Sequence, residues 1–135
     1  MTFKQWSDSL PSVVTSDAVW RLGVYRLALY AHALAYEDAA ILARDGTTRL
    51  VAGQVERSMG SIAANVAEGF SRNSRRDRAR LYEYALCSAR EAVVWYVGAR
   101  NVLGEQRVLE VLEVLQHIRR QLITAVQDQR RRAGR

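Results

Sequence analysis

Five of the nine residues from Arg72 to Arg80 are arginines, which makes this segment the densest group of potential anion-binding side chains in the sequence. The group consists of Arg72, Arg75, Arg76, Arg78 and Arg80, and Asp77 is its one acidic member. Arginine presents a planar, permanently charged fork of N–H donors that fits the oxygens of a phosphate. The group therefore indicates phosphate recognition, as in nucleic-acid binding. The alternative is an ordinary solvated run of charge.

The position of these arginines in the predicted fold favours phosphate binding over an ordinary solvated run of charge. They lie in a turn before a helix that begins at Ser74, and in the first turn of that helix. The helix dipole disfavours each cation there by about 0.3–1 kcal/mol, whereas the free N–H groups attract anions. A second basic group consists of Arg130 to Arg132 with Arg135. It gives weaker support for phosphate binding, because a helix C-terminus stabilises cations even without a ligand.

A stripe of polar residues marks the helix that precedes this turn. Its members recur at steps of three or four residues and so share one helix face: Gln54, Ser58, Ser61, Asn65 and Glu68. Serine and asparagine form helices poorly, and solvated faces usually carry long charged side chains instead. Two interpretations stay open, namely a buried or interfacial polar seam and a solvated face.

No arrangement of residues typical of an enzyme is found. His32 and His117 have no histidine or carboxylate three or four residues downstream, so the pairs that build helical metal sites are absent. Glycine-rich phosphate loops and nucleophile elbows are also absent. Cys87 is the single cysteine, and its neighbours predict a small buried residue. We expect no enzymatic activity, no catalytic residues, no metal and no cofactor.

Composition places the chain among globular, cytoplasmic proteins. It has 135 residues, of which 49% are hydrophobic and 25% charged, with a net charge of +6. Residues 1–16 lack the pattern of a signal peptide, and the longest nearly uncharged stretch is about half a membrane span. We therefore expect no membrane segment. Lys4 is the single lysine, and the excess of arginine reflects either a GC-rich genome or phosphate recognition.

Hydrophobic periodicity predicts four long helices. The first runs from near Ser16 to about Arg44, and the second begins after Thr47 or Thr48 and runs to about Phe70. The third runs from Ser74 to Gly104, and the fourth begins at Glu105. The second helix has the apolar seam Val55, Met59, Ile62 and Val66. The third has Leu81, Ala85, Ser88, Ala92, Trp95, Ala99 and Val102. The fourth has Val108, Val111, Leu115, Ile118, Leu122 and Ala125.

Long helices joined by short loops pack as antiparallel neighbours. The predicted fold class is therefore all-α, an antiparallel up-down four-helix bundle. We divide the chain into a flexible N-terminal arm (residues 1–16), the bundle domain (17–129) and a basic C-terminal tail (130–135). The first helix carries polar residues scattered around its axis and has no broad polar face. Such a helix is buried on several sides, which predicts a homo-oligomer.

The segment Ser61–Gly69, followed by Arg72 and Ser74, resembles a known family. These are the four-helix bundle proteins encoded within intervening sequences of 23S ribosomal RNA genes. Their pattern Ser-Ile-x-x-Asn-Ile-Ala-Glu-Gly is met here with one change, valine for the second isoleucine. Further matches are Gln54, Arg57, Ala85, Ser88 and Glu91, and the likeness covers about residues 20–104. Cys87 stands where relatives often have glycine.

The resemblance implies a bundle that assembles into a ring, typically a pentamer, without established enzymatic activity. A related branch includes the accessory protein of diversity-generating retroelements, a basic barrel that binds reverse transcriptase and nucleic acid. The residues that carry the family pattern and the polar seam are Gln54, Arg57, Ser61, Asn65, Glu68, Gly69, Ser88 and Glu91.

Two functions follow for this chain. In the first, the chain is a non-enzymatic, oligomeric protein that binds structured RNA, or another RNA or DNA, through its arginine-rich surface. The alternative is a protein-interaction adaptor or scaffold whose ring docks a protein partner, for example a reverse transcriptase.

Overall fold

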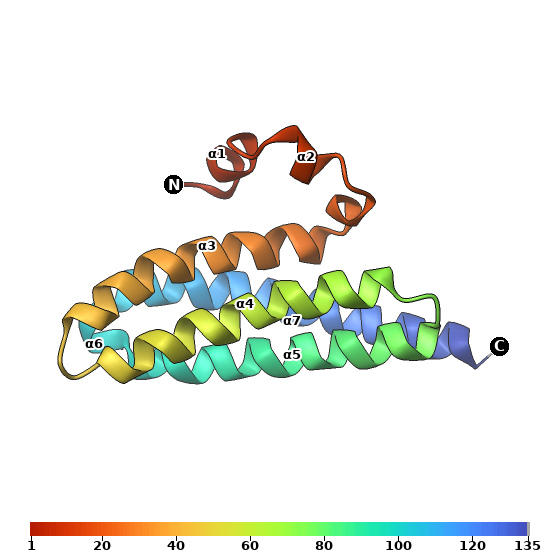
Figure 1. The fold of residues 1–135 in the computed structure, drawn as a ribbon. Helices are drawn as coiled ribbons and strands as arrows, with labels where there is room; N and C mark the ends of the chain where they lie inside the picture. Colours follow the sequence, from red (N-terminus) through yellow and green to blue (C-terminus); the bar gives the residue numbers. More distant parts are fainter. Residues whose placement is uncertain (135) are drawn as a thin grey trace.

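The computed structural model describes residues 1–134, and every regular element in this range is a helix. Four long helices lie side by side, and successive ones run in opposite directions: α3 Gly23–Arg44, α4 Arg49–Ser71, α5 Arg75–Gly98 and α7 Glu105–Ala133 (Figure 1). Helix α3 packs on α4, α4 on α5 and α5 on α7, while α7 also contacts α3. The prediction of an all-helical protein is confirmed.

Short helical segments precede and connect the long ones. Before α3 come α1 Phe3–Asp8, α2 Ser12–Thr15 and the 3-10 helix η1 Ala18–Arg21. Between α5 and α7 lies α6 Arg100–Leu103. The predicted third helix is therefore interrupted at Ala99. Gly104 follows α6 with a φ of 89°, a left-handed conformation that glycine adopts without steric cost.

The core lies between the four long helices, along the predicted seams. Val55, Met59, Ile62 and Val66 of α4 are all fully buried. On α7 the seam is correct up to Leu122, after which Val126 is buried and Ala125 only half-buried. On α5, Ser88 and Trp95 are half-buried, as is Val102 on α6, and the α5 core is completed by Tyr82, Ala89 and Tyr96. A straight helix drifts about 20° per heptad from a strict seven-residue repeat, which explains these shifts.

Helix α1 is folded against α3, so residues 1–16 are not the wholly flexible arm expected from the sequence. Trp6 is buried, and its ring centroid lies 5.4 Å from that of Tyr30. Phe3 lies edge-on to Tyr30 at 5.4 Å, and the Tyr30 hydroxyl donates to the Met1 carbonyl at 3.0 Å. Phe3 and Trp6 are three residues apart on α1, but Tyr30 lies on α3, so periodicity within one helix did not reveal their common contact.

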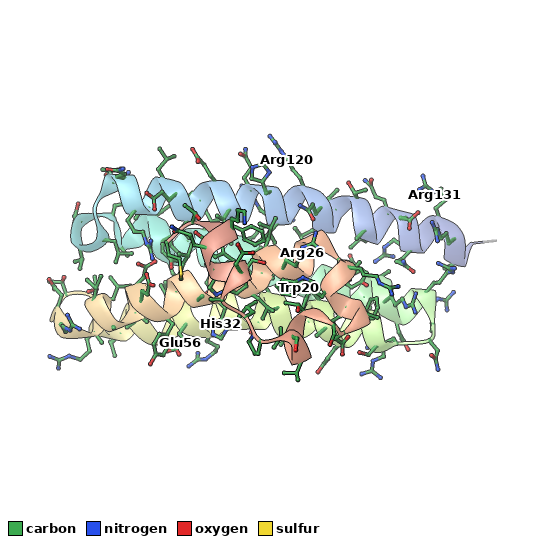
Figure 2. All side chains as sticks on the ribbon, turned by 90° about the horizontal axis from the view of Figure 1, so that it is seen from above. Trp20, Arg26, His32, Glu56, Arg120 and Arg131 are labelled. Atoms are coloured by element: carbon green, nitrogen blue, oxygen red, sulfur yellow. The ribbon has the colours of Figure 1, made fainter. Side chains whose placement is uncertain are left out.

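The start of the first long helix also differs from the prediction. Asp17 caps η1 by accepting a hydrogen bond from the Val19 N–H at 2.9 Å, and α3 begins only at Gly23. Arg26 donates to the Trp20 carbonyl at 2.8 Å and lies over its ring, which ties η1 to α3 (Figure 2). The chain's own N-terminal segment thus covers part of the α3 surface that we had assigned to a second subunit.

Two further expectations need correction. Arg130 to Arg132 lie in the last turn of α7, which continues to Ala133, so the bundle helix does not end before them; Arg135 lies outside the described residues. Cys87 is exposed, because it lies two residues and about 200° around α5 from the buried Ala85. Within residues 1–134, no helix combines the length and apolar character needed to cross a membrane.

Candidate nucleic-acid interface

The turn between α4 and α5 is held by hydrogen bonds from its own residues. The Ser74 hydroxyl caps α5 by accepting from the Asp77 N–H at 3.3 Å, which agrees with the predicted start of this helix at Ser74. Arg78, which is half-buried, donates its Nε–H to the Arg72 carbonyl at 2.7 Å. Arg78 therefore braces the turn with one of its donors.

The remaining arginines of this group differ in how they are engaged. Arg72, Arg75 and Arg76 are exposed and make no ion pair within residues 1–134. Arg80 is 3.5 Å from Asp77, and its guanidinium carbon lies 6.0 Å from the centre of the Tyr84 ring. Three cations at the start of α5 are thus available to an anion, whereas Arg80 already has partners on its own helix.

The basic end of α7 lies beside the start of α5. Arg130 forms an ion pair with Glu83 of α5, while Arg131 and Arg132 each approach Asp128 to 3.2 Å. Desolvation opposes the ionisation of Asp128, but these two guanidinium groups outweigh it and hold its pKa below the ordinary value. Figure 2 places Arg131 on the last turns of α7, pointing outward.

Two arginine groups far apart in the sequence therefore meet at one end of the molecule (Figure 1). We call this surface the arginine end, and it comprises Arg72, Arg75, Arg76, Arg78, Arg130, Arg131 and Arg132. The predicted division of residues 130–135 into a separate tail did not place these arginines beside the α4–α5 turn. A shared end could have been anticipated, since antiparallel helices return the end of the fourth to the start of the third.

The polar stripe of α4 satisfies most of its groups within its own helix. The buried Ser58 hydroxyl donates to the Gln54 carbonyl at 2.8 Å, and Asn65, which is half-buried, donates to the Ser61 carbonyl at 2.9 Å. Glu68 is exposed in the single chain and makes no hydrogen bond within residues 1–134. The stripe thus runs from a buried serine to a carboxylate in solvent.

The other residues of the family pattern are spread along α4 and α5. Arg57 is exposed and donates to Gln54 at 3.3 Å. On α5, Ser88 is half-buried and Glu91 is exposed. Within residues 1–134, no hydrogen bond or ion pair links the Arg57, Ser88 or Glu91 side chain to Glu68.

Gly69 has a packing role at the end of the family pattern. A Cβ atom at this position would lie 2.6 Å from Cε1 and 2.8 Å from Cδ1 of Tyr82 on α5. Such separations are shorter than real carbon contacts allow, so only glycine lets α4 and α5 approach this closely. Gly69 therefore sets the distance between the two helices just before the arginine turn.

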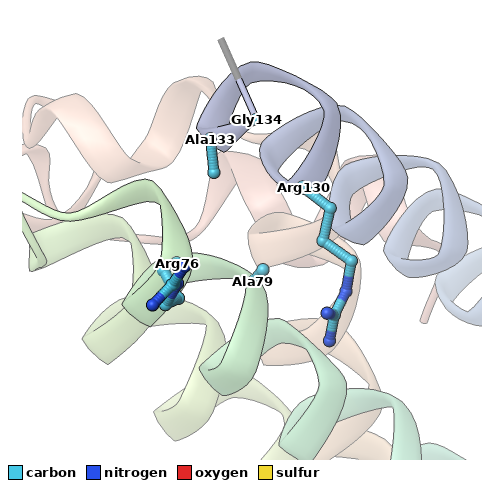
Figure 3. Close-up of a pocket in the computed structure, with 5 residues that line it drawn as sticks. All are labelled: Arg76, Ala79, Arg130, Ala133 and Gly134. Atoms are coloured by element: carbon cyan, nitrogen blue, oxygen red, sulfur yellow. The ribbon is translucent and has the colours of Figure 1, made fainter.

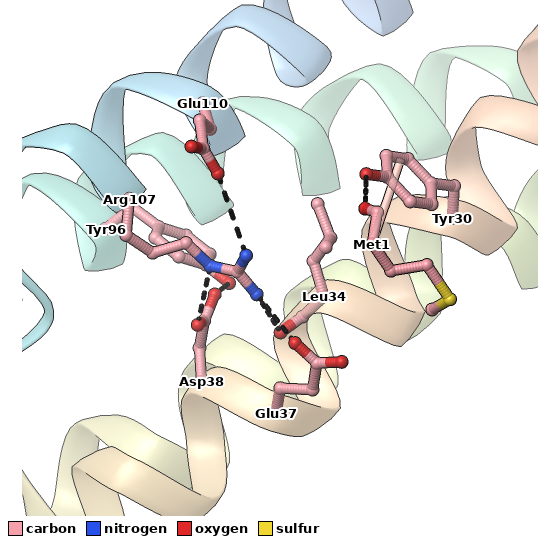
Figure 4. Close-up of polar contacts among 8 residues, drawn as sticks. All are labelled: Met1, Tyr30, Leu34, Glu37, Asp38, Tyr96, Arg107 and Glu110. Atoms are coloured by element: carbon pink, nitrogen blue, oxygen red, sulfur yellow. Dashed lines mark hydrogen bonds and ion pairs between the residues drawn. The ribbon is translucent and has the colours of Figure 1, made fainter. Parts of the chain in front are cut away.

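A buried polar network that sequence reasoning missed joins three of the long helices (Figure 4). Asp38 of α3 is 2% exposed and accepts the Tyr96 hydroxyl of α5 at 2.7 Å. It also accepts the Nε–H of Arg107 from α7 at 2.9 Å. The Arg107 guanidinium further donates to Glu37 at 3.1 Å. Since the partners are on separate helices, no local spacing signals this network.

Burial and charge both act on the groups of this network. Burial raises the pKa of Asp38, although the hydrogen bond from Tyr96 and the charge of Arg107 oppose the rise. Burial also raises the pKa of Tyr96, and the neighbouring Asp38 carboxylate adds to the effect. For Arg107, burial favours loss of the proton, but Asp38 and Glu37 outweigh it and the pKa lies above its usual value. The network fixes helix positions in the core, away from the arginine end.

The remaining groups offer little for other chemistry. Among residues 1–134, no three histidine, cysteine, aspartate or glutamate side chains gather closely enough to hold a metal ion. His32 lies against Gly60, where a Cβ atom would be 3.2 Å from its Nε2. It therefore fills the contact between α3 and α4.

Comparison with known proteins identifies relatives of this chain. The sequence model of the family described as 23S rRNA-intervening sequence protein matches residues 22–124. A crystal structure of a protein with unknown function from the S23 ribosomal protein family of Bacteroides thetaiotaomicron is similar in fold, with a TM-score of 0.72 and 21% sequence identity. The similarity covers 76% of this chain and 97% of that one. No curated protein matches the sequence.

Proposed function

Since the chain belongs to the 23S rRNA-intervening sequence protein family, we propose that it is a non-enzymatic protein that binds structured RNA or another nucleic acid through its arginine end. One observation carries the proposal. The arginines of the α4–α5 turn and those of the α7 end lie together although they are far apart in the sequence. Arg72, Arg75 and Arg76 also have no carboxylate partner within residues 1–134.

The chemistry of the arginine end favours contacts to phosphates over contacts to bases. Sequence-specific RNA binding relies on aromatic side chains that stack on splayed bases, or on amides that read base edges. The arginine end instead offers exposed guanidinium groups, which bind phosphate oxygens irrespective of sequence. We expect recognition of the phosphate backbone, with affinity that depends steeply on salt.

Salt titrations test this proposal directly. With three or four phosphates contacted by each chain, the log–log slope of the binding constant against salt should be about −0.7 to −0.9 per contact. Replacing Arg72, Arg75 and Arg76 with glutamine should flatten the slope and weaken binding to all sequences alike. Arg78 is left in place because it braces the turn. Fluorescence anisotropy with labelled RNA and DNA measures both quantities.

A matched control carries the same charge change elsewhere on the surface. Arg44, Arg49 and Arg90 are exposed and lie outside the arginine end, so their replacement with glutamine should leave most of the slope intact. Equal losses in the two triple variants would contradict a localised site. If the unaltered protein binds neither RNA nor DNA at low salt, the proposal fails and the adaptor function takes its place.

We also propose that the four long helices form an up-down bundle that assembles into a ring, most simply a pentamer. On the α3–α4 face lies an apolar groove of about 300 Å³ lined by Tyr36, Ala39, Ala40, Ala43, Ala52, Gly53 and Glu56. Tyr36 is 71% exposed there. The opposite α5–α7 face exposes Val97 and Leu109. Different surfaces on opposite faces suit head-to-tail contacts, and such contacts close into a ring when the rotation between neighbouring subunits divides a full turn. The proposed occupant of the groove is therefore a second copy of this chain.

Assembly is tested by light scattering at micromolar concentration. We expect a mass several times the 15.3 kDa of one chain, and five times that mass for a pentamer. Ala40→Arg would place a charge in the groove and should yield monomers with unchanged helix content, whereas Arg90→Ala, outside the groove, should not. A monomeric unaltered protein would contradict the proposal. A dimer or tetramer would reject the pentamer alone.

A further inference from the structure

A small recess lies within the arginine end, between the start of α5 and the end of α7 (Figure 3). Its volume is about 230 Å³, and it is lined by Arg76, Ala79, Arg130, Ala133 and Gly134. In the close-up, Ala79 lies between the two arginines, which come from different helices. The recess therefore combines two cationic side chains with a lining of very small residues.

The recess depends on residues outside the matched family region. Arg76 and Ala79 belong to the matched range 22–124, whereas Arg130, Ala133 and Gly134 follow it. The continuation of α7 to Ala133 brings these residues to the start of α5. Without that last stretch of α7, Arg76 would stand alone on an open surface.

The size of the recess limits its ligand. A water molecule occupies about 30 Å³ of liquid, so the recess has room for a phosphate group with several waters. Sites for drug-sized molecules usually measure about 300–1,000 Å³, so the recess itself encloses less than a whole nucleotide and the rest of a strand would lie outside it. The small side chains of Ala79 and Ala133 leave this space, since longer ones would fill it.

The chemistry of the lining favours a phosphate at the end of a strand. A phosphomonoester has three free oxygens and a charge of about −1.5 to −2, whereas a phosphodiester within a strand has two free oxygens and a single charge. Guanidinium forks on two sides of a recess match the group with more oxygens and charge. Arg76 has no ion pair within residues 1–134. Arg130 pairs with Glu83 through Nη2, which orients it toward α5 and leaves its Nε and Nη1 donors without a partner within residues 1–134.

We propose that this recess binds a terminal phosphomonoester of a nucleic-acid strand, between Arg76 and Arg130. The inference rests on the proposed function, because the exposed arginines around the recess hold the adjoining strand. The proposal gives Arg130 of α7 a role in the same site as Arg76. From the sequence, the C-terminal arginines were a separate basic tail with weaker support for phosphate binding.

The test compares one labelled oligonucleotide in three forms, with a 5′-phosphate, with a 3′-phosphate and with hydroxyl groups at both ends. We expect one phosphorylated form to bind about tenfold more tightly than the unphosphorylated form, which is the effect of one or two additional charge-assisted hydrogen bonds. Inorganic phosphate at millimolar concentration should reduce this preference. The end that is preferred identifies the source of the phosphate.

Two variants separate the recess from the surrounding surface. Ala133→Leu fills the recess with a larger side chain at an exposed position and leaves the charge unchanged. Arg130→Gln removes one of the two guanidinium groups that line the recess. Both should abolish the preference for the phosphorylated form. Ala133→Leu should leave binding of the unphosphorylated form nearly unchanged, whereas Arg130→Gln also removes a charge from the arginine end and should weaken binding of every form. Gln116→Leu, which introduces the same side chain at an exposed position in the middle of α7, is the control and should keep the preference.

The outcomes distinguish this inference from the proposed function. If the unaltered protein binds all three forms equally, the recess does not recognise a terminal phosphate, and the proposed function is unaffected. A preference that survives Ala133→Leu and Arg130→Gln also overturns the inference about the recess. Failure to bind any form overturns both.

Discussion

Replacing Asp38 with alanine should lower the free energy of unfolding by about 3 kcal/mol, near the low end of the range for removing one partner of a buried ion pair. The substitution strands the Tyr96 hydroxyl and the Arg107 guanidinium, both of which donate to the Asp38 carboxylate. The loss stays near the low end because the Arg107 side chain is 25% exposed and retains Glu37 as a partner. Urea unfolding followed by circular dichroism measures the effect.

Two controls show whether burial is the cause. Glu37→Ala removes a carboxylate from the same guanidinium at a site where the carboxylate side chain is 55% exposed, and should cost less than about 1 kcal/mol. Tyr96→Phe removes one donor and should cost about 1 kcal/mol. The Asp38→Ala and Tyr96→Phe losses should not add in the double variant, since the two groups share one hydrogen bond. Equal costs for Asp38→Ala and Glu37→Ala would contradict a network that holds the core together.

Replacing Gly69 with alanine should cost about 1–3 kcal/mol, the usual effect of overpacking a core contact. The added methyl group would meet the Tyr82 ring at 2.6 Å. Tyr82 is 6% exposed and Leu81 beside it 5%, so neither can move aside without repacking the core. Thermal and urea unfolding at one fixed protein concentration give the loss, because assembly makes apparent stability depend on concentration.

The matched control for this substitution is Gly98→Ala. Gly98 is the last residue of α5, and a Cβ atom there would have nothing within 4 Å. Alanine favours helix over glycine by up to about 1 kcal/mol, so this variant should be as stable as the parent or slightly more stable. In a Gly69→Ala, Tyr82→Leu double variant, the removal of the ring should recover part of the loss. A neutral Gly69→Ala would show that α4 and α5 tolerate a wider spacing.

These two sites also connect stability with the arginine end. Gly69 sets the approach of α4 to α5 directly before the turn that carries Arg72 and Arg75. A shift of α4 at this point would displace those arginines relative to Arg130 of α7. We therefore expect Gly69→Ala to weaken nucleic-acid binding more than its effect on stability would suggest, whereas Asp38→Ala acts at a distance from the arginine end.

The sequence by itself determined the features that depend on neighbours along the chain. The three-and-four spacing of Val55, Met59, Ile62 and Val66 specifies a buried helix face, because such residues align on one side of an α-helix. Ser74 predicted the start of α5, since a serine hydroxyl can accept the free N–H groups of a first turn. The position of the arginine group at that turn was predicted for the same local reason, and Arg72, Arg75 and Arg76 are exposed there.

Only the tertiary structure decided which distant residues meet. Phe3 and Trp6 pack on Tyr30, Asp38 receives Tyr96 and Arg107, and Arg130 lies across a recess from Arg76. None of these contacts is encoded by a spacing along the chain. Each depends on the path of the backbone and on the rotation of each helix about its axis, which the packing of all the helices sets together. Periodicity reports which face of a helix is buried, and tertiary packing decides which side chains that face meets.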